Sequence, residues 1–416
     1  MKSIFRFSNT ISVFFLFFFP SNTVIFSTSK GVTAHDPYDP TGNITIKWDV
    51  MSWTPDGYVA VVDIINSQLY RTVQLPGWKL GWTWAKRDEI IWSAFGAQAI
   101  DQGNCSMYIG NIPHSCSKRP IIVDLSTDTP YNQRVDNCCR GGRLSSRYQA
   151  INKSTASFQI SVGNAGTSNR TVRMPKNFTF IGGRAEYACG PAKRVRSSRF
   201  VTPDLRRTTQ AFMTWKVVCT YKRANVANKS PSCCASLSSF DQRRKANCPT
   251  CSCGCRSKTC NTRSQGNPGI VPPLMKCTDH MCPASINWHI LKPREKAAYT
   301  TVHVSISNFN YRMNYTDWTL LVNHPFINKL TRVVHANHKQ FPNFKTAQLM
   351  WGMKHKNAII PSSSRQGSTI SWIMQLYKDN NSTNTNTTST SSSCTKDWCA
   401  PTEIFFNGDR CLIASP

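Results

Sequence analysis

The chain has 416 residues, with 50 Lys and Arg against 21 Asp and Glu, so its formal net charge is +29 at pH 7. The length predicts two or three domains, and a hydrophobic fraction of 40% is enough to build their cores. Together with 18 cysteines, these numbers argue against a cytosolic metabolic enzyme, a polytopic membrane protein and a disordered protein.

The N-terminus predicts export. Lys2 and Arg6 precede an uninterrupted apolar run, Ile11 to Phe19. This run is too short to span a bilayer and does not alternate as a buried helix would, but it is typical of a secretory signal. We expect a signal peptide over 1–34, cleaved between Ser27 and Ala34. No later stretch reaches 18 apolar residues, so we expect no transmembrane segment and a mature chain in an oxidising compartment.

Residues 35–228 are dominated by short strand patterns separated by Gly, Pro and Asn turns. In the first strand apolar residues alternate with polar ones at Ile44, Ile46, Trp48 and Val50. A turn at 54–57 follows, and further strands are predicted at 58–65, 78–84, 171–180 and 210–221. Pro175 interrupts one of them and favours an edge position. The pattern predicts an antiparallel β-sandwich.

Residues 229–282 are dense in cysteine and end in a Pro-rich stretch, which predicts a disulfide-rich connector. Strand patterns resume over 283–416, with Val302, Val304 and Ile306 on one face of a strand. The Ser/Thr/Asn-rich run at 380–393 is typical of a loop. The predicted fold is therefore all-β, with two antiparallel β-sandwich domains joined by the connector.

Aromatic density between residues 48 and 92 is the main functional signal. A planar row of aromatic rings can stack on the apolar C–H faces of a cellulose chain. The candidate carbohydrate-binding residues are Trp48, Trp53, Tyr58, Trp78, Trp82 and Trp84. The alternative is that they are core, since Trp is buried on average. Trp53, Tyr58 and Trp78 flank turns and are the better stacking candidates, whereas Trp215 and Trp318 are expected in the core.

Export predicts that the cysteines form disulfides. The expected disulfide residues are Cys105, Cys116, Cys138, Cys139, Cys189, Cys219, Cys233, Cys234, Cys248, Cys251, Cys253, Cys255, Cys260, Cys277, Cys282 and Cys411. In each vicinal pair, 138–139 and 233–234, we expect both cysteines to take distant partners. The C-x-x-C spacing at 248–251 also suits zinc, but exported thiolates usually oxidise, so no metal is expected.

Glycosylation sequons support export. The expected glycan acceptors are Asn43, Asn152, Asn169, Asn177, Asn228, Asn314, Asn380, Asn381 and Asn386. Asn104 also lies in a sequon, but the disulfide expected at Cys105 disfavours it.

The positive charge has three interpretations. A basic chain usually suggests nucleic acid, but a secreted glycoprotein rarely meets it, so no nucleic-acid partner is expected. Attraction to acidic pectin fits export. A solvated basic surface is the third interpretation.

Catalysis finds little support in the sequence. A glycoside hydrolase needs two positioned carboxylates, and no pair stands in a recognisable motif. We expect no enzyme activity, no catalytic residue and no cofactor. A polysaccharide-modifying wall enzyme remains the alternative, and a purely electrostatic pectin-binding structural protein is another.

Several long motifs resemble the COBRA-like family of plant cell-wall glycoproteins. They include DPYDPTGNITIKWDVMSWTPDGYVA, PGWKLGWTWAKRDEIIWSAFGAQ, QAFMTWKVVCTY, CPTCSCGC and FFNGDRC, and the resemblance covers residues 36 to 411. It implies an N-terminal region likened to a carbohydrate-binding module that contacts cellulose, followed by a Cys-rich signature and a C-terminal domain. It also implies a role in cellulose biosynthesis and microfibril organisation during oriented cell growth or wall thickening, usually at the plasma membrane through a GPI anchor.

The chain departs from the family pattern at four places. Cys233, Cys234, Ala235 and Ser236 stand where the family commonly has CCVS. Ser115 and Cys116 replace a Cys pair, which puts one local disulfide in question. Residues 345–400 match poorly, which would loosen the C-terminal sandwich.

The fourth departure is at the C-terminus. Only five residues follow Cys411, and no apolar tail for a GPI signal can be drawn through the charged stretch before it. We therefore expect a protein secreted into the cell wall, or one at the outer face of the plasma membrane if a GPI tail is missing from this sequence.

Overall fold

The structure is a computed structural model that describes residues 36–201, 204–222, 232–239, 283–291, 299–310, 312–363, 368–377 and 400–413. The predicted signal peptide, most of the predicted connector and the run at 380–393 lie outside these residues. Within them the regular elements are strands and short 3-10 helices. No helix of the described residues is long and apolar enough to cross a membrane.

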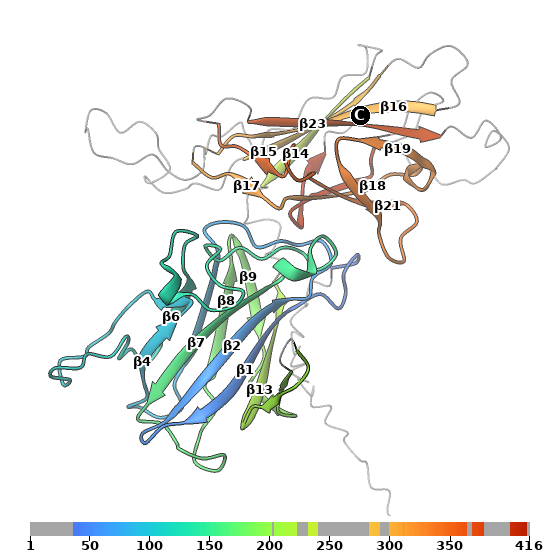
Figure 1. Ribbon diagram of the computed structural model, residues 1–416. Helices are drawn as coiled ribbons and strands as arrows, with labels where there is room; N and C mark the ends of the chain where they lie inside the picture. The colour runs from blue at the N-terminus through green and yellow to red at the C-terminus, as the bar shows by residue number, and fades with distance from the viewer. Residues whose placement is uncertain are drawn as a thin grey trace, which may run out of the picture. The chain divides into compact units, whose positions relative to one another are not determined.

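The N-terminal region forms one folded-over sheet with the strand order β4-β7-β2-β1-β13-β9-β8-β3-β6-β5 (Figure 1). Its strands are β1 (Ile44–Trp53), β2 (Tyr58–Asn66), β3 (Trp78–Thr83), β4 (Ile90–Phe95), β5 (Ala97–Ala99), β6 (Ile121–Asp124), β7 (Thr155–Gly163), β8 (Lys176–Gly182), β9 (Ala185–Cys189) and β13 (Met213–Tyr221). Strand β10 (Lys193–Val195) pairs with β13, and β11 (Arg199–Val201) pairs with β12 (Thr208–Gln210). The 3-10 helices are η1 (Tyr131–Gln133) and η2 (Ile151–Lys153).

This sheet closes on itself as a sandwich. Hydrogen bonds pass from one layer to the other through β13 and β9. The ring of Trp48 on β1 lies 5.1 Å from that of Trp82 on β3, although three strands separate β1 from β3 in the sheet. The alternating residues of β1 therefore face the second layer, because each layer has one apolar side to bury.

The C-terminal region has a six-stranded sheet, β19-β23-β16-β15-β14-β26, and a five-stranded sheet, β20-β21-β18-β24-β25. Its strands are β14 (Cys233–Ser239), β15 (Ala284–Ile290), β16 (Tyr299–Asn308), β17 (Tyr315–Thr316), β18 (Thr319–Asn323), β19 (Leu330–Val334), β20 (Asn337–Gln340), β21 (Ala347–Trp351), β22 (Ile359–Ile360), β23 (Thr369–Tyr377), β24 (Glu403–Phe406), β25 (Asp409–Arg410) and β26 (Leu412–Ile413). The 3-10 helix η5 (Ile327–Lys329) precedes β19. Between the sheets the rings of Trp318 and Trp372 stack 5.5 Å apart.

The predicted all-β, two-sandwich fold is confirmed, with local corrections. Cys233–Ser239, placed in the connector by sequence, is strand β14, and it pairs in parallel with β15 and β26. The strand after Pro175 is not at an edge, because it begins at Lys176 and β8 pairs with both β3 and β9. In the poorly matching region, β21 and β23 are each paired on both sides.

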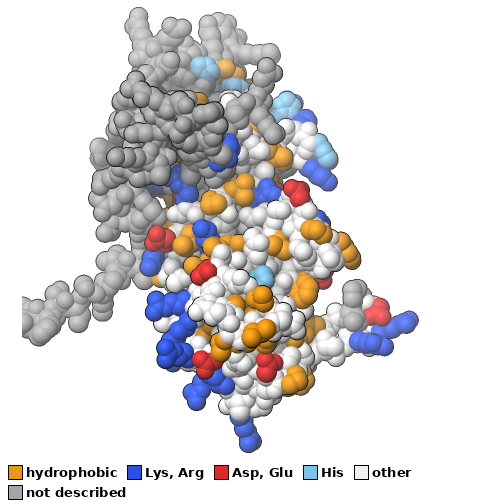
Figure 2. Space-filling view, turned by 90° about the vertical axis from the view of Figure 1, so that its left-hand side faces the viewer, with side chains coloured by type: hydrophobic (Ala, Val, Ile, Leu, Met, Phe, Trp, Pro, Cys, Tyr) orange, Lys and Arg blue, Asp and Glu red, His pale blue; other side chains and the backbone are white. Residues whose placement is uncertain are grey.

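The surface of the described residues reflects the composition. Blue Lys and Arg side chains outnumber red carboxylates in the view of Figure 2, and hydrophobic side chains gather on the lower half of this face. Among the exposed large hydrophobic residues, six belong to β4, β6 and the segment between them: Phe95, Ile100, Met107, Ile109, Ile112 and Ile121.

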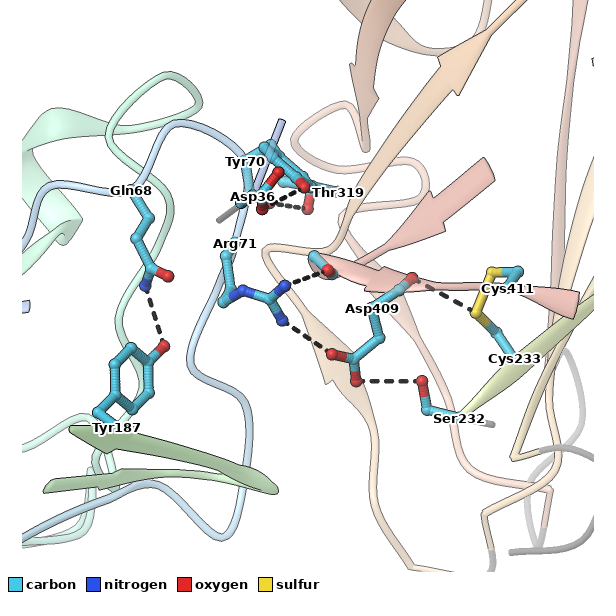
Figure 3. Close-up of polar contacts among 11 residues, drawn as sticks. Asp36, Gln68, Tyr70, Arg71, Tyr187, Ser232, Cys233, Thr319, Asp409 and Cys411 are labelled. Carbon is cyan, nitrogen blue, oxygen red and sulfur yellow. Dashed lines mark hydrogen bonds and ion pairs between the residues drawn. A yellow bond between two sulfur atoms is a disulfide. The ribbon is translucent and has the colours of Figure 1, made fainter. Parts of the chain in front are cut away.

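The two sandwiches meet along a seam of specific contacts. Arg71, which follows β2, forms an ion pair with Asp409 of β25 at 2.8 Å and also donates to the Gly408 carbonyl. Asp409 in turn accepts a hydrogen bond from Ser232 (Figure 3). The Thr319 hydroxyl donates to the Tyr70 carbonyl at 2.7 Å. An apolar cluster seals the seam and includes Tyr38, Tyr70, Leu321, Phe341 and Phe405.

Four disulfides join described cysteines: Cys105–Cys116, Cys138–Cys139, Cys189–Cys219 and Cys233–Cys411. Cys234 is also disulfide-bonded. The expectation of distant partners is wrong for the first vicinal pair, where Cys138 bonds Cys139. The backbone at Cys139 has a φ of 68°, and the chain turns sharply there. The other expected cysteines, Cys248, Cys251, Cys253, Cys255, Cys260, Cys277 and Cys282, lie outside the described residues.

Candidate functional site

Five of the six residues predicted to stack on cellulose are buried. The exposed fractions of Trp48, Tyr58, Trp78, Trp82 and Trp84 are all 3% or less. The ring of Trp48 stacks on that of Trp215 and meets those of Trp82 and Trp84 edge to face, so these rings already pack against one another. The prediction of surface stacking is wrong for them, because the second layer covers the face that they share. Trp215 and Trp318 are buried, as predicted.

Trp53 is different, since it lies at the end of β1 and is half-buried. Its ring packs at 5.9 Å against Phe212, which is 51% exposed and comes just before β13. The Phe212 amide donates to the Val50 carbonyl, which fixes the two rings side by side. Trp53 is therefore the one member of the predicted set that can reach a ligand.

A second half-buried aromatic pair lies at the same end of the sheet. The Trp92 ring, on β4, meets the Tyr108 ring edge to face at 5.4 Å. The indole Nε1 of Trp92 donates to Asp56 at 2.9 Å, and Asn164 donates to the Tyr108 hydroxyl at 2.8 Å. Register places the two pairs at the same end of the sheet, because Trp53 lies opposite Tyr58, Tyr58 opposite Val162, and Val162 opposite Ile91, the residue before Trp92.

We call Trp53, Trp92, Tyr108 and Phe212, with Asp56 and Asn164, the aromatic end of the N-terminal sandwich. Figure 1 shows the ends of β1 and β7 at this end of the sheet. Gly163 closes β7 there, and a Cβ atom on it would lie 2.1 Å from Trp92 Nε1. The glycine thus lets the Nε1 edge of the indole approach the backbone closely.

The segment that carries Tyr108 is held in place by several contacts. Cys105 and Cys116 bond each other, and the Ser115 hydroxyl donates to the Asp101 carbonyl at 3.0 Å. His114 Nε2 accepts from the Ala99 amide, and burial lowers the pKa of His114, which favours the neutral ring. Ser115 is thus a buried polar residue, and the local disulfide that the sequence put in question forms through Cys116.

The chemistry of the aromatic end suits a sugar ligand. Half-exposed rings offer flat apolar surface, while the Asp56 carboxylate and the Asn164 amide lie beside it to bind hydroxyl groups. Met107 and Ile109 extend the apolar surface and are 78% and 97% exposed. The aromatic-rich segment of the sequence includes Trp92, but its candidate role is visible only from contacts between residues far apart in the chain. Asp56 lies 36 residues from Trp92, and Asn164 lies 56 residues from Tyr108.

A basic face covers β10 and the adjoining part of β13. Lys193, Arg194, Arg196, Arg199 and Lys216 are all exposed. Lys193 lies directly opposite Lys216, and Lys216 lies opposite Lys47 of β1. Among the described residues, Lys47 pairs with Asp49 and Asp63, whereas the five cations of the basic face form no ion pair. Like charges in register repel, so this face favours a polyanion.

The expected glycan acceptors fall into two groups. Asn152, Asn169 and Asn177 are exposed, whereas Asn43 and Asn314 are partly buried. Asn314 Oδ1 accepts a hydrogen bond from the Ser362 amide. Asn228, Asn380, Asn381 and Asn386 lie outside the described residues.

Two family models match the chain. The model of the COBRA N-terminal domain matches residues 58–222, and that of the COBRA family C-terminal domain matches residues 266–415. Together the two models cover most of the chain and follow the division into two sandwiches.

Curated relatives are similar over almost the whole chain. Protein COBRA of Arabidopsis thaliana is 45% identical over 409 residues, which are 94% of this chain and 87% of the relative. COBRA-like protein 1 of Oryza sativa subsp. japonica is 46% identical, over 92% of this chain and 86% of the relative. COBRA-like protein 4 of Arabidopsis thaliana is 44% identical, over 92% and 89%.

Proposed function

The chain belongs to the COBRA family of plant cell-wall proteins, and from this premise we propose that it is a non-catalytic, secreted wall protein that binds cellulose at its aromatic end. Binding would hold the protein on newly made chains and so organise microfibril deposition during oriented growth or wall thickening. The observation that carries the proposal is the Trp92–Tyr108 pair, half-exposed and oriented by Asp56 and Asn164.

The geometry favours stacking by these rings over stacking by the rings inside the sandwich. An aromatic contact contributes about 1 kcal/mol beyond the area that it buries. Trp48 and its neighbours already make such contacts with one another, whereas Trp92, Tyr108, Trp53 and Phe212 retain ring surface for a polymer.

The test is retention on crystalline cellulose. The Trp92→Ala/Tyr108→Ala double variant should bind about thirtyfold more weakly, because two stacking contacts of about 1 kcal/mol each are lost. Tyr377→Ala removes a 46% exposed aromatic side chain from β23 and should bind like the parent chain. Thermal unfolding of each variant verifies its fold. Unchanged retention by a folded double variant contradicts the proposal.

The same purified protein tests the alternative that the chain is an enzyme. Soluble sugar released from cellulose or xyloglucan over time, at a rate proportional to protein concentration, would make the chain a polysaccharide-modifying enzyme. We expect binding with no release.

A second function, binding of acidic pectin, is favoured by the basic face. The Lys193→Gln/Arg194→Gln/Lys216→Gln variant should lose affinity for de-esterified pectin and keep affinity for cellulose. Lys345→Gln/Lys354→Gln/Lys356→Gln removes the same charge from exposed sites of the C-terminal sandwich. If both variants lose affinity for pectin equally, the net charge alone explains the binding and the basic face has no special role.

Salt distinguishes the two functions further. Exposed charges are screened over about 8 Å at physiological ionic strength. Pectin binding should weaken sharply towards about 0.5 M salt, whereas stacking on cellulose should barely change. An equal salt response for both polymers would mean that one mechanism serves both.

A further inference from the structure

A small cavity lies at the seam between the two sandwiches, away from the proposed cellulose and pectin sites. Its volume is about 120 Å³. Each water molecule of the liquid occupies about 30 Å³, so there is room for a group of carboxylate size but not for a whole sugar ring. The polar residues at its wall are Gln74, Arg140, Arg143, Ser145, Lys153, Thr316 and Asp317.

The charges around this cavity do not balance. Three cations, Arg140, Arg143 and Lys153, face a single carboxylate, Asp317. Lys153 takes that carboxylate, with its Nζ 3.1 Å from Asp317 Oδ1. The cavity wall is therefore left with two guanidinium groups and no second carboxylate.

The two arginines make hydrogen bonds to neutral groups instead. Arg143 donates from Nη1 to the Thr316 hydroxyl at 2.7 Å and from Nε to the Arg140 carbonyl at 2.9 Å. Arg140 donates from Nη2 to the carbonyls of Asn137 and Thr155. The nearby carboxylate of Asp124 accepts backbone N–H groups of residues 139, 140 and 142 rather than a guanidinium.

Two buried polar atoms at the cavity wall have no protein partner. Arg140 Nε is a donor and Gln74 Oε1 an acceptor, and neither makes a hydrogen bond with the described residues. A buried charged donor without a partner is costly. Burial lowers the pKa of Arg140, and so does the charge of Arg143, whereas Asp124 and Asp317 raise it. An anion between the arginines would give Arg140 Nε an acceptor and would counter the cost of its buried charge.

We propose that this cavity binds an oxyanion of carboxylate size, held by Arg140 and Arg143 of one sandwich beside Thr316 of the other. The uronate group of an acidic sugar and inorganic phosphate share this chemistry. Because residues of both sandwiches line the site, the bound anion fastens the seam. The proposal depends neither on the aromatic end nor on the basic face.

Titration calorimetry of the full secreted chain with galacturonate and, separately, with inorganic phosphate tests it. Saturable binding of either anion is expected, and the tighter one identifies the source. Glucose, a neutral sugar, should not bind. Since Asn152 directly precedes Lys153 and is an expected glycan acceptor, titrations are run before and after enzymatic deglycosylation. Absence of saturable binding of both anions in either form overturns the proposal.

Three variants assign the binding to this cavity. Arg143→Gln should weaken anion binding on the order of tenfold, because it removes a charged hydrogen-bond donor. Arg147→Gln removes the same charge four residues away, at an exposed position outside the cavity, and should leave binding unchanged. Asp317→Asn should tighten binding, because it removes the only carboxylate and frees Lys153; Asn tolerates the φ of 50° found there.

The opposite signs of these effects keep the test decisive. If Arg143→Gln does not fold, Asp317→Asn alone still predicts tighter binding. Equal weakening by Arg143→Gln and Arg147→Gln, or no change with Asp317→Asn, would place the anion elsewhere on the basic surface and overturn the proposal.

Discussion

The two ends of the N-terminal sandwich use the same residue types in opposite ways. At the end where β1 begins and β2 finishes, Tyr38 and Tyr70 are 6% and 1% exposed, because the C-terminal sandwich covers them. Their hydroxyl groups donate to Glu403 and Asp36. At the other end of the sandwich, Trp53 of β1 and Trp92 of β4 remain half-exposed.

This difference separates structural aromatics from candidate binding aromatics. At the seam each ring is enclosed and each hydroxyl has a partner, so nothing is left for a ligand. At the aromatic end the polar partners Asp56 and Asn164 orient the rings but do not cover them. An aromatic residue in a β-sandwich can therefore be assigned a role only when the element that covers it is known.

Replacing Arg71 at the seam should lower the free energy of unfolding more than any other change proposed for this end of the N-terminal sandwich. Arg71→Met removes one partner of a buried ion pair and a cation stacked 3.6 Å from the Tyr221 ring. Loss of one partner of a buried pair typically costs about 3 to 5 kcal/mol. Because the Asp409 carboxylate is partly exposed, water screens the pair and the cost is smaller. We therefore expect the free energy of unfolding, measured with denaturant, to fall by about 3 kcal/mol.

The matched control is Arg147→Met, which removes an exposed arginine of the same region. It should change the free energy of unfolding by less than about 0.5 kcal/mol. Equal stability of Arg71→Met and Arg147→Met would show that the seam contributes little to folding.

The seam end should also respond to pH through Asp39. Burial raises the pKa of this carboxyl from its ordinary value of 3.8 to about 6, although the Leu69 amide donates to it. The folded state thus holds its proton more tightly than the unfolded state. Stability should rise as pH falls from about 6 to about 4, by up to about 3 kcal/mol, since each pKa unit is worth about 1.4 kcal/mol.

Asp39→Asn keeps the acceptor for Leu69 and removes the ionisation. It should flatten this part of the pH dependence and stabilise the chain at pH 7. Denaturant unfolding of both chains at pH 4, 5, 6 and 7 measures the effect. Parallel pH profiles would mean that Asp39 ionises alike in the folded and unfolded states.

The aromatic end should give the smallest effect, seen in binding rather than in stability. Asp56→Ala removes the acceptor of the Trp92 indole, a hydrogen bond worth about 1 kcal/mol. Cellulose affinity should fall about fivefold. Asp56→Asn keeps an acceptor oxygen and should restore most of it. If Ala and Asn weaken binding equally, the carboxylate charge and not the orientation of Trp92 matters.

Much of the fold was predictable from local pattern. Alternation at Ile44, Ile46, Trp48 and Val50 identifies the inward face of β1, because successive side chains of a strand point to opposite sides. The strand at Cys233–Ser239 was missed, since cysteine and serine lack the branched or aromatic character of typical strands. It is a strand because β15 and β26 pair with it on both sides.

The sequence by itself determined the all-β class, the division into two sandwiches and the family, because these depend on local periodicity and on long motifs. Only the tertiary structure decided which aromatics reach solvent. Alternation marks a common face for Trp48, Tyr58 and Trp78, but whether that face meets water depends on a second layer that folds over it. For the same reason the cavity between Arg140 and Asp317 exists only once both sandwiches meet, since its walls come from residues more than 170 positions apart.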